Sequence, residues 1–414
     1  MKKLIGPFTQ ILTLSGLATK GPLNDGQLEV ITAGGLLIEN GLILQTGRFD
    51  RLHASHPGVT VEEVTGENVL LPGFIDCHTH LCFAGNRAKD YSLRIQGKTY
   101  LEIAKSGGGI WDSVTQTRQA DGPTLVDLLQ QRVARHLSEG VTTIEVKSGY
   151  GLDIPSELKQ LRAIQTVAQN CIADLVPTCL AAHLHPKDFA GSSAAYLDHI
   201  LRYLLPLVKA ENLASRVDIF IEESAFGSAE ALDYLSQAKD MGFQLTVHAD
   251  QFTTGGLQTA ILAGAVSADH LEASAASEIA LLKGSETVAV VLPGASLGLG
   301  MPYAPARKFL DAGACLAIAS DWNPGSAPMG DLLMQAAVMS AAEKLSSAEV
   351  FSGLCFRAAK ALSLKDRGML VPGMQADIQA YPCADYREIL YQQGKMKPQT
   401  VWKRGQNSHK NILR

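Results

Sequence analysis

The segment Pro72-Gly73-Phe74-Ile75-Asp76-Cys77-His78-Thr79-His80 carries the clearest fold signal in the chain. A Pro-Gly pair leads into a short apolar strand, and two histidines follow in alternate positions. Side chains two residues apart lie on the same side of a strand, so His78 and His80 can direct two imidazoles at one metal ion. A His-x-His pair alone is often only a pair of hydrogen-bonded packing residues. The preceding strand favours a metal site here.

Three more polar residues end apolar runs in the same way. They are His248, His270 and Asp321, which follow the runs 244–247, 266–269 and 316–320. In a parallel barrel the carboxyl ends of all strands open onto one face, where active sites are built. Any one of these residues alone is explained as a buried histidine or a capping aspartate. Together, in barrel order, they predict one shared site.

The middle of the chain, residues 66–365, alternates short apolar runs with longer amphipathic segments. The expected strands are 73–76, 141–146, 174–179, 217–221, 244–247, 265–268, 288–292 and 315–319. Helix-sized stretches such as 124–138 and 156–170 separate them. This α/β pattern predicts a (β/α)₈ barrel of the TIM type, with a doubly wound open sheet as the alternative.

The two ends of the chain have a different pattern. Residues 28–45 indicate a β-hairpin, because Asn40-Gly41 separates two apolar runs and both residues tolerate the positive φ of a tight turn. After residue 366 the chain returns to glycine, proline and short β-like pieces. We therefore expect residues 1–65 and 366–414 to form one small β-sandwich module outside the barrel.

Composition excludes several classes of protein. The 414 residues are 46% hydrophobic and 19% charged, which excludes intrinsic disorder. With 36 Lys and Arg against 41 Asp and Glu, the net charge is −5, so the chain lacks the broad cationic surface that nucleic-acid binding requires. The longest uncharged stretch, 287–306, is interrupted by prolines and glycines, which argues against a membrane span.

The cysteines and the N-terminus bear on the cellular compartment. Seven scattered cysteines do not resemble a disulfide framework. The basic start of the chain lacks the apolar run of a signal peptide. Both observations favour a soluble protein of the reducing cytoplasm.

With these motifs in place, the chain resembles the amidohydrolase superfamily and, more narrowly, the imidazolonepropionase family, the ring-opening hydrolases of histidine degradation. The resemblance spans nearly the whole chain. Besides 72–80, it rests on Lys147-Ser148-Gly149-Tyr150-Gly151-Leu152, His183, Val247-His248-Ala249-Asp250-Gln251, Ser267-Ala268-Asp269-His270-Leu271-Glu272 and Ser320-Asp321-Trp322-Asn323-Pro324-Gly325-Ser326. Segment 72–80 specifies only the superfamily, whereas 147–152 and 320–326 specify the family.

The resemblance implies that His78, His80, His248 and Asp321 bind one zinc or iron ion. Three neutral imidazoles and a carboxylate leave room for water, as a catalytic site requires. Such an ion lowers the pKa of its water towards ~7, so hydroxide is available at cytoplasmic pH. Asp321 then takes the water proton, while His270 orients the water and stabilises charge on the attacked carbonyl. Both metals accept this ligand set.

The same resemblance implies the substrate, 4-imidazolone-5-propanoate, whose ring opens to give N-formimidoyl-L-glutamate. Arg87 would bind the propionate carboxylate, for which a guanidinium fork is well shaped. The other expected substrate contacts are Tyr150, His183, Gln251, Asn323, Gly325 and Ser326. The family resemblance is also consistent with a homodimer.

Gln251 separates this reaction from deamination. In cytosine-deaminase-like relatives, a glutamate three residues after the ligand histidine shuttles a proton, and glutamine has no titratable proton near neutral pH. An amide can still hydrogen-bond a ring N–H, which favours hydrolysis of a cyclic amide. A heterocycle deaminase is the alternative enzyme. The other alternative is a barrel that has lost catalysis and serves as a binding or scaffold protein. In such a protein we expect some metal ligands to be replaced, but here the set is intact.

Two further features leave room for other roles. Dinuclear relatives bridge two metals with a carboxylated lysine or a glutamate, and Lys147 is the candidate for such a bridge. Because the residues after it resemble the substrate loop of the family, we expect a single metal. The pair Glu222-Glu223 follows another expected strand, and we expect it to support other residues through hydrogen bonds.

Overall fold

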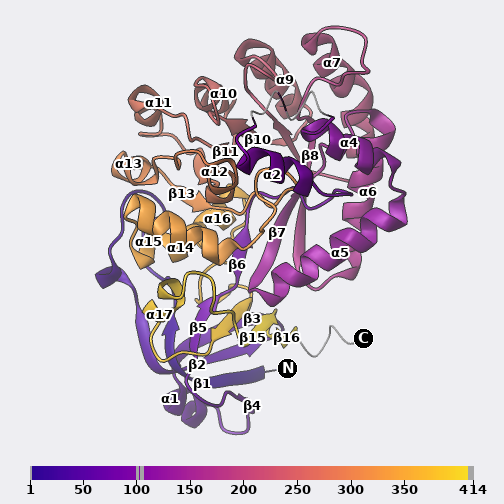
Figure 1. Ribbon diagram of the computed structural model, residues 1–414. Coiled ribbons are helices and arrows are strands. Elements are labelled where there is room, and N and C mark those ends of the chain that lie inside the picture. The colour runs from indigo at the N-terminus through magenta and orange to yellow at the C-terminus, as the bar shows by residue number, and fades with distance from the viewer. Residues whose placement is uncertain (1, 99–101, 103–106, 409–414) are drawn as a thin grey trace.

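The computed structural model describes residues 2–98, 102 and 107–408. Within these residues, the strands form two eight-stranded sheets. One sheet is the parallel barrel of the middle of the chain, and the other is built from both ends (Figure 1).

The barrel strands follow one another around the sheet in chain order. They are β6 (Phe74–Asp76), β7 (Val141–Lys147), β8 (Asp174–Ala182), β9 (Arg216–Ile219), β10 (Gln244–Ala249), β11 (Ser267–His270), β12 (Val288–Val291) and β13 (Leu316–Ile318). Beyond β6 and β13, Thr79 and Trp322 form a parallel bridge that closes the ring. The (β/α)₈ prediction is confirmed, and the alternative of an open doubly wound sheet is wrong.

Helices surround the barrel (Figure 1). They are α2 (Ala88–Ile95), α4 (Ile110–Gln119), α5 (Gly122–Ser138), α6 (Ile154–Asn170), α7 (Ser193–His199), the π-helix η2 (Ile200–Leu204), α8 (Leu205–Ala210), α9 (Ser228–Asp240), α10 (Gly256–Ala263), α11 (Ala276–Leu281), α12 (Pro293–Leu299), α13 (Ala306–Asp311), α14 (Leu332–Glu343), α15 (Ser347–Leu354) and α16 (Phe356–Ala361). Among the described residues, no helix combines the length and the apolar composition that a membrane span requires.

The two helices expected from the sequence, 124–138 and 156–170, each begin two residues earlier than predicted. The Asp121 carboxylate accepts a hydrogen bond from the amide of Thr124 at 2.9 Å, and Asp153 accepts one from the amide of Ser156 at 2.7 Å. Each helix has a proline in its first turn, where the missing N–H costs nothing. Aspartate caps and early prolines therefore fix where α5 and α6 begin.

The ends of the chain form a single mixed sheet. Its elements are β1 (Lys2–Leu12), β2 (Val30–Glu39), β3 (Leu42–Arg48), β4 (Thr60–Glu63), β5 (Val69–Pro72), β14 (Ile378–Tyr381), β15 (Thr400–Lys403) and β16 (Gln406–Asn407), with η1 (Asp25–Gln27), α1 (Phe49–Ser55) and α17 (Arg387–Tyr391) in the connections. The order is β16-β15-β14-β5-β1-β2-β3, and β4 also pairs with β1. The pairing of β14 with β5 joins the two ends, and apolar side chains including Phe8, Ile378 and Trp402 pack on one another there.

Two local features of this sheet concern the predictions. Asn40 and Gly41 form the turn between β2 and β3 with φ of 52° and 83°, as expected for a tight hairpin. β5 lies beyond residue 65 but pairs within the terminal sheet, so the chain enters the barrel only between Pro72 and Phe74.

An ion cluster joins the terminal sheet to the barrel. Asp174, at the start of β8, lies 2.7 Å from Nζ of Lys403, the last residue of β15, and 2.8 Å from Nη2 of Arg404, which follows it. Arg367 also contacts Asp174, at 2.6 Å. The terminal sheet thus lies at the end of the barrel where the strands begin, and the carboxyl ends of the strands open on the other side.

Candidate active site

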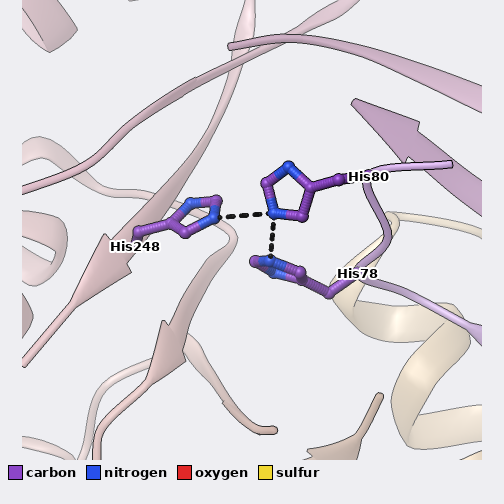
Figure 2. Close-up of side chains that lie close together, drawn as sticks. All are labelled: His78, His80 and His248. Atoms are coloured by element: carbon purple, nitrogen blue, oxygen red, sulfur yellow. Dashed lines mark hydrogen bonds between the residues drawn. The ribbon is translucent and has the colours of Figure 1, made fainter. Parts of the chain in front are cut away.

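Three histidine side chains converge at the carboxyl ends of the barrel strands (Figure 2). Nε2 of His78 lies 3.3 Å from Nε2 of His80, and that atom lies 3.2 Å from Nε2 of His248. His78 and His80 follow β6, and His248 lies near the end of β10. All three side chains are buried. Residues 168 or more positions apart in the chain therefore meet at one point.

Asp321 and His270 complete the cluster. Oδ1 of Asp321 lies 3.6 Å from Nε2 of His78 and 3.4 Å from Nε2 of His80. The backbone at Asp321 has φ of 50°, and its amide donates to the carbonyl of His78 at 3.1 Å. His270, at the end of β11, places a ring nitrogen within 4.8 Å of ligand atoms of His78 and Asp321. The structure thus brings together all five residues that the strand ends indicated.

Two carboxylates lie behind the histidines. Nδ1 of His78 is hydrogen-bonded to Oδ2 of Asp269 at 2.6 Å, and Nδ1 of His248 lies 2.9 Å from Oδ2 of Asp218. A carboxylate accepts, so Nδ1 of His78 carries the proton, and the Asp218 carboxylate beside Nδ1 of His248 favours the same tautomer in that ring. In this tautomer Nε2 of each ring presents its lone pair to the centre. Neither aspartate was predicted from the sequence to support the site. Their only local signal is a carboxylate inside a short apolar strand.

The ligand histidines are neutral. Burial lowers the pKa of His78 and of His80 well below the ordinary value, and it lowers the pKa of His248 to about 3 even though Asp218 acts in the opposite direction. His270 differs: burial lowers its pKa, but Glu272, 3.4 Å from Nδ1, together with Asp321 and Asp269, outweighs burial and raises it. Neutral imidazole is the form that binds metal, whereas a ring paired with a carboxylate is suited to stabilising negative charge.

The donor set fits a divalent metal ion. The Nε2 lone pairs of His78 and His248 both face Nε2 of His80, and Oδ1 of Asp321 adds negative charge beside them. These neighbouring atoms are 3.2 to 3.6 Å apart, close to the ~3.4 Å separation in a tetrahedral zinc site with bonds of about 2.0–2.1 Å. Converging lone pairs repel unless a cation lies between them, so the cluster is a metal-binding site.

Arg87 lies beside the loop that carries Asp321. Its Nε donates to Oδ2 of Asp90 at 2.8 Å, and the same oxygen accepts from the amide of Gly109 at 2.8 Å. A Cβ at Gly325 would lie only 2.2 Å from Nη1 of Arg87. The absence of a side chain at Gly325 therefore makes room for the guanidinium, which joins two residues that the sequence placed separately in substrate binding.

Tyr150 and His183 lie on another side of the metal cluster. The His183 ring stacks on His80 with centroids 5.3 Å apart and an interplanar angle of 17°, and Tyr150 lies 5.6 Å from His183. Nδ1 of His183 lies 3.0 Å from the carbonyl of Gly149, which can only accept. Nδ1 of His183 therefore carries the proton, and Nε2 of the neutral ring is left as an acceptor. Burial lowers the pKa of His183 to about 4, so the ring is neutral at pH 7.

Side chains from the first turns of α6 accept hydrogen bonds from the loop that carries Tyr150. Oε1 of Glu157 accepts from the amides of Gly151 and Leu152, both at 2.8 Å. Oε1 of Gln160 accepts from the amides of Gly149 and Tyr150, both at 3.2 Å. Neither Glu157 nor Gln160 was predicted from the sequence to support this loop. Polar residues on the buried side of an amphipathic helix were the available signal.

The loop after β13 is stabilised by Asn323. Its Nδ2 donates to the carbonyl of Asp321 at 2.7 Å, and its Oδ1 accepts from the amides of Gly325 and Ser326 at 2.7 and 2.8 Å. The Ser326 hydroxyl donates to Oδ2 of Asp321 at 3.3 Å. The Asn323 amide is thus engaged in holding the loop, while the Ser326 hydroxyl reaches the Asp321 carboxylate.

Gln251 follows β10 and is buried, with 7% of its surface exposed. The residues directly after it are held by Glu222, whose carboxylate accepts from the amides of Phe252 and Thr253 at 2.8 and 3.1 Å. Glu222 thus has the supporting role expected of it.

Lys147, the candidate bridge between two metals, is engaged in ion pairs. Its ammonium is fully buried, 2.8 Å from Oε1 of Glu145 and 2.8 Å from Oδ2 of Asp218. Burial lowers its pKa, but Asp218, Glu145 and Asp269 outweigh burial and raise it above the ordinary value. Carboxylation of a lysine needs an uncharged amine, and the product would be an anion among carboxylates. The ion pairs of Lys147 therefore argue against a bridging role, and binding of a single metal stays a prediction.

Comparisons with known proteins agree with this geometry. A model of the amidohydrolase family matches residues 69–407. The chain is 40% identical over 371 residues to the imidazolonepropionase of Deinococcus deserti, covering 89% of this chain and 90% of that one. It is 37% identical over 404 residues to the imidazolonepropionase of Bacillus cereus, covering 96% and 94%. A crystal structure of atrazine chlorohydrolase from Arthrobacter aurescens, complexed with zinc, shares the fold with a TM-score of 0.69 at 15% identity, covering 98% and 94%.

Proposed function

The chain belongs to the imidazolonepropionases of the amidohydrolase family, and from this premise we propose that it hydrolyses 4-imidazolone-5-propanoate to N-formimidoyl-L-glutamate with the residues described above. It is a hydrolase of cyclic amides. The observation that carries the proposal is the convergence of three histidine Nε2 atoms and the Asp321 carboxylate at the carboxyl ends of the strands.

We assign His78, His80, His248 and Asp321 as the ligands of one zinc or iron ion. An ion held there supplies Lewis acidity and lowers the pKa of water at the site towards ~7. The chain itself keeps the three rings neutral by burial and fixes two of them through Asp269 and Asp218.

Asp321 is the proposed proton carrier. Its Oδ1 faces the histidine ligands, while its Oδ2 faces the Ser326 hydroxyl at 3.3 Å. One oxygen can therefore remain with the ligand set while the other accepts the proton of the attacking water and delivers it to the leaving ring nitrogen. Proton transfer of this kind typically contributes about 10²–10⁴-fold to the rate.

His270 is the proposed stabiliser of the tetrahedral oxyanion. The Glu272 carboxylate lies on its Nδ1 side and favours the protonated ring. Nε2 is then left to donate towards negative charge that develops beside Asp321. This role needs His270 close to the ligands without being one of them.

Substrate recognition divides between two sides of the metal cluster. Arg87, fixed by Asp90 and seated against Gly325, binds the propionate carboxylate. On the other side, Tyr150 lies against the imidazolone ring, and Nε2 of His183 accepts from a ring N–H. Gln251 and Ser326 hydrogen-bond the remaining polar atoms, with Asn323 and the Gly325 backbone shaping that wall.

The same residues argue for ring opening rather than deamination. Gln251 stands where a proton-shuttling glutamate would be required, and an amide cannot replace it. A proton carrier on the other side of the site, Asp321, is sufficient for cleavage of a ring C–N bond.

We also propose a cytoplasmic location and a homodimer. All seven cysteines are free thiols, and six of them are buried, which suits a reducing compartment. The proposed partner is a small substrate that carries a carboxylate.

The test is to follow the decay of imidazolone absorbance with the purified protein, then to repeat it after chelation and after adding back zinc or ferrous iron. We expect turnover that chelation abolishes and metal restores. Absence of imidazolone turnover, together with ammonia release from cytosine or guanine, would replace this function with that of a deaminase.

A further inference from the structure

Lys147 lies beneath the metal cluster and contacts three carboxylates at once. Its Nζ is 2.8 Å from Glu145, 2.8 Å from Asp218 and 4.0 Å from Asp269. The lysine, Glu145 and Asp218 have fully buried side chains, and that of Asp269 is 1% exposed. A buried ammonium among carboxylates is costly unless each charge is compensated.

Each of these carboxylates supports a different part of the ligand set. Asp218 lies 2.9 Å from Nδ1 of His248, and Asp269 is hydrogen-bonded to Nδ1 of His78. Glu145 accepts from the amide of Thr79 at 3.1 Å. Thr79 is the residue between His78 and His80, so Glu145 fixes the backbone that carries both histidines.

The backbone of Lys147 joins the same unit. Its amide donates to the carbonyl of Thr79 at 3.0 Å, and the Thr79 hydroxyl donates to the carbonyl of Glu145 at 2.6 Å. Hydrogen bonds therefore join the end of β7 to the segment that carries His78 and His80. The Lys147 side chain also contacts Asp218, which lies beside His248 on β10.

We propose that Lys147 is a positioning residue for the metal centre, whose single ammonium holds the supports of all three histidine ligands in place. Without it, three buried carboxylates repel one another and rotate away from the groups that they hold. The inference rests on the proposed metal site, but it concerns how tightly that site binds rather than which reaction follows.

The test is Lys147→Met, which keeps an unbranched side chain of similar length and removes the charge. Zn²⁺ and Co²⁺ affinities are measured by competition with a chromophoric chelator, and the Co²⁺ absorption spectrum reports ligand geometry. We expect metal affinity to fall about 10–100-fold, the range typical for loss of a group that orients ligands, with an altered cobalt spectrum.

Lys403→Met is the matched control. Lys403 is also buried between two carboxylates, Asp174 and Asp377, but it lies in the terminal sheet. This variant is expected to lose stability and to keep the metal affinity and cobalt spectrum of the unaltered protein. A purely structural loss would affect both lysine variants alike.

A second variant, Lys147→Met/Glu145→Gln, removes one charge of each sign and retains an acceptor for the Thr79 amide. It serves if the single variant does not fold, and weakened metal binding is again expected. Metal affinity within twofold of the unaltered protein in either variant would overturn the proposal. The proposal would also be overturned if both Lys147 variants failed to fold while Lys403→Met folded, because Lys147 would then be required for folding. Failure of the unaltered protein to bind metal would instead contradict the proposed function.

Discussion

Nδ1 of His78 is hydrogen-bonded to Oδ2 of Asp269 at 2.6 Å, across the interior of the barrel. His78 follows β6 and Asp269 lies on β11; around the ring, β7 to β10 lie between these two strands on one side, and β12 and β13 on the other. The Thr246 hydroxyl donates to the same oxygen at 3.1 Å. A ligand and the group that sets its tautomer therefore come from distant strands, and the closed barrel is what brings them together.

Asp269→Asn is expected to weaken metal binding by about 10–100-fold. An amide can present its NH₂ group to Nδ1 and favour the ring tautomer whose proton sits on Nε2, where the metal must bind. Metal affinity is measured by chelator competition, with Asp174→Asn, in the ion cluster beside the terminal sheet, as the control. Equal affinities in the two variants would show that Asp269 does not orient His78.

Asp321→Asn is expected to lower kcat by about 10²–10⁴-fold at saturating metal, because an amide cannot accept and return the proton. Metal content is measured on the same samples, since Asp321 is also a proposed ligand. Ser326→Ala, which removes only the hydroxyl that donates to Oδ2, is expected to have a much smaller effect. Unimpaired turnover by a metal-loaded Asp321→Asn protein would exclude Asp321 as the proton carrier.

Arg87→Ala is expected to raise KM by about 10–100-fold and to change kcat much less, since a carboxylate remote from the ring is bound equally in ground and transition states. Arg87→Lys should recover only part of the loss, because an ammonium lacks the bidentate fork. Arg94→Ala, at the other end of α2, is the control; that side chain donates to the carbonyl of Gly298. An unchanged KM in Arg87→Ala would remove the assigned role.

The barrel and its five converging residues were predictable because their signals are local. Strand alternation directs His78 and His80 to one side, and a polar residue at the end of an apolar run indicates a position at the mouth of the barrel. Neither inference needs knowledge of a distant partner. The closed ring then guarantees that such residues meet.

The supporting residues were not predictable in the same way. Asp269 and Asp218 act through partners 191 and 30 positions away, and Lys147 reaches Asp218 and Asp269 on two other strands, in addition to Glu145 on its own strand. The contacts between strands could not be read from the sequence. Their contacts exist only once the strands are packed. β5 shows the same limit, because its apolar run is suited to either sheet. Its pairing with β14, more than 300 residues later in the chain, places it in the terminal sheet.

Glu157→Gln tests the support of the substrate loop. The carboxylate accepts three backbone amides of this loop, and an amide side chain would turn an NH₂ group towards one of them. We expect a loss of about 1–3 kcal/mol in unfolding free energy and a raised KM. Glu222→Gln, which disturbs the loop after Gln251 similarly, is the comparison for stability. Retention of both stability and KM in Glu157→Gln would contradict the role.

His183→Gln tests the neutral state of that ring through the pH dependence of stability. The folded-state pKa is lowered to about 4 by burial, from an ordinary 6.5. Between these values the unfolded chain binds a proton that the folded chain does not, so stability falls as pH falls. From pH 7 to 5 this ring accounts for a loss of about 2 kcal/mol. Urea unfolding of the chelated protein at pH 7, 6 and 5 should show that increment missing in His183→Gln and present in Tyr150→Phe, which alters the neighbouring packing without a group that titrates in this range. The same pH dependence in all three proteins would mean that His183 is protonated within the folded site.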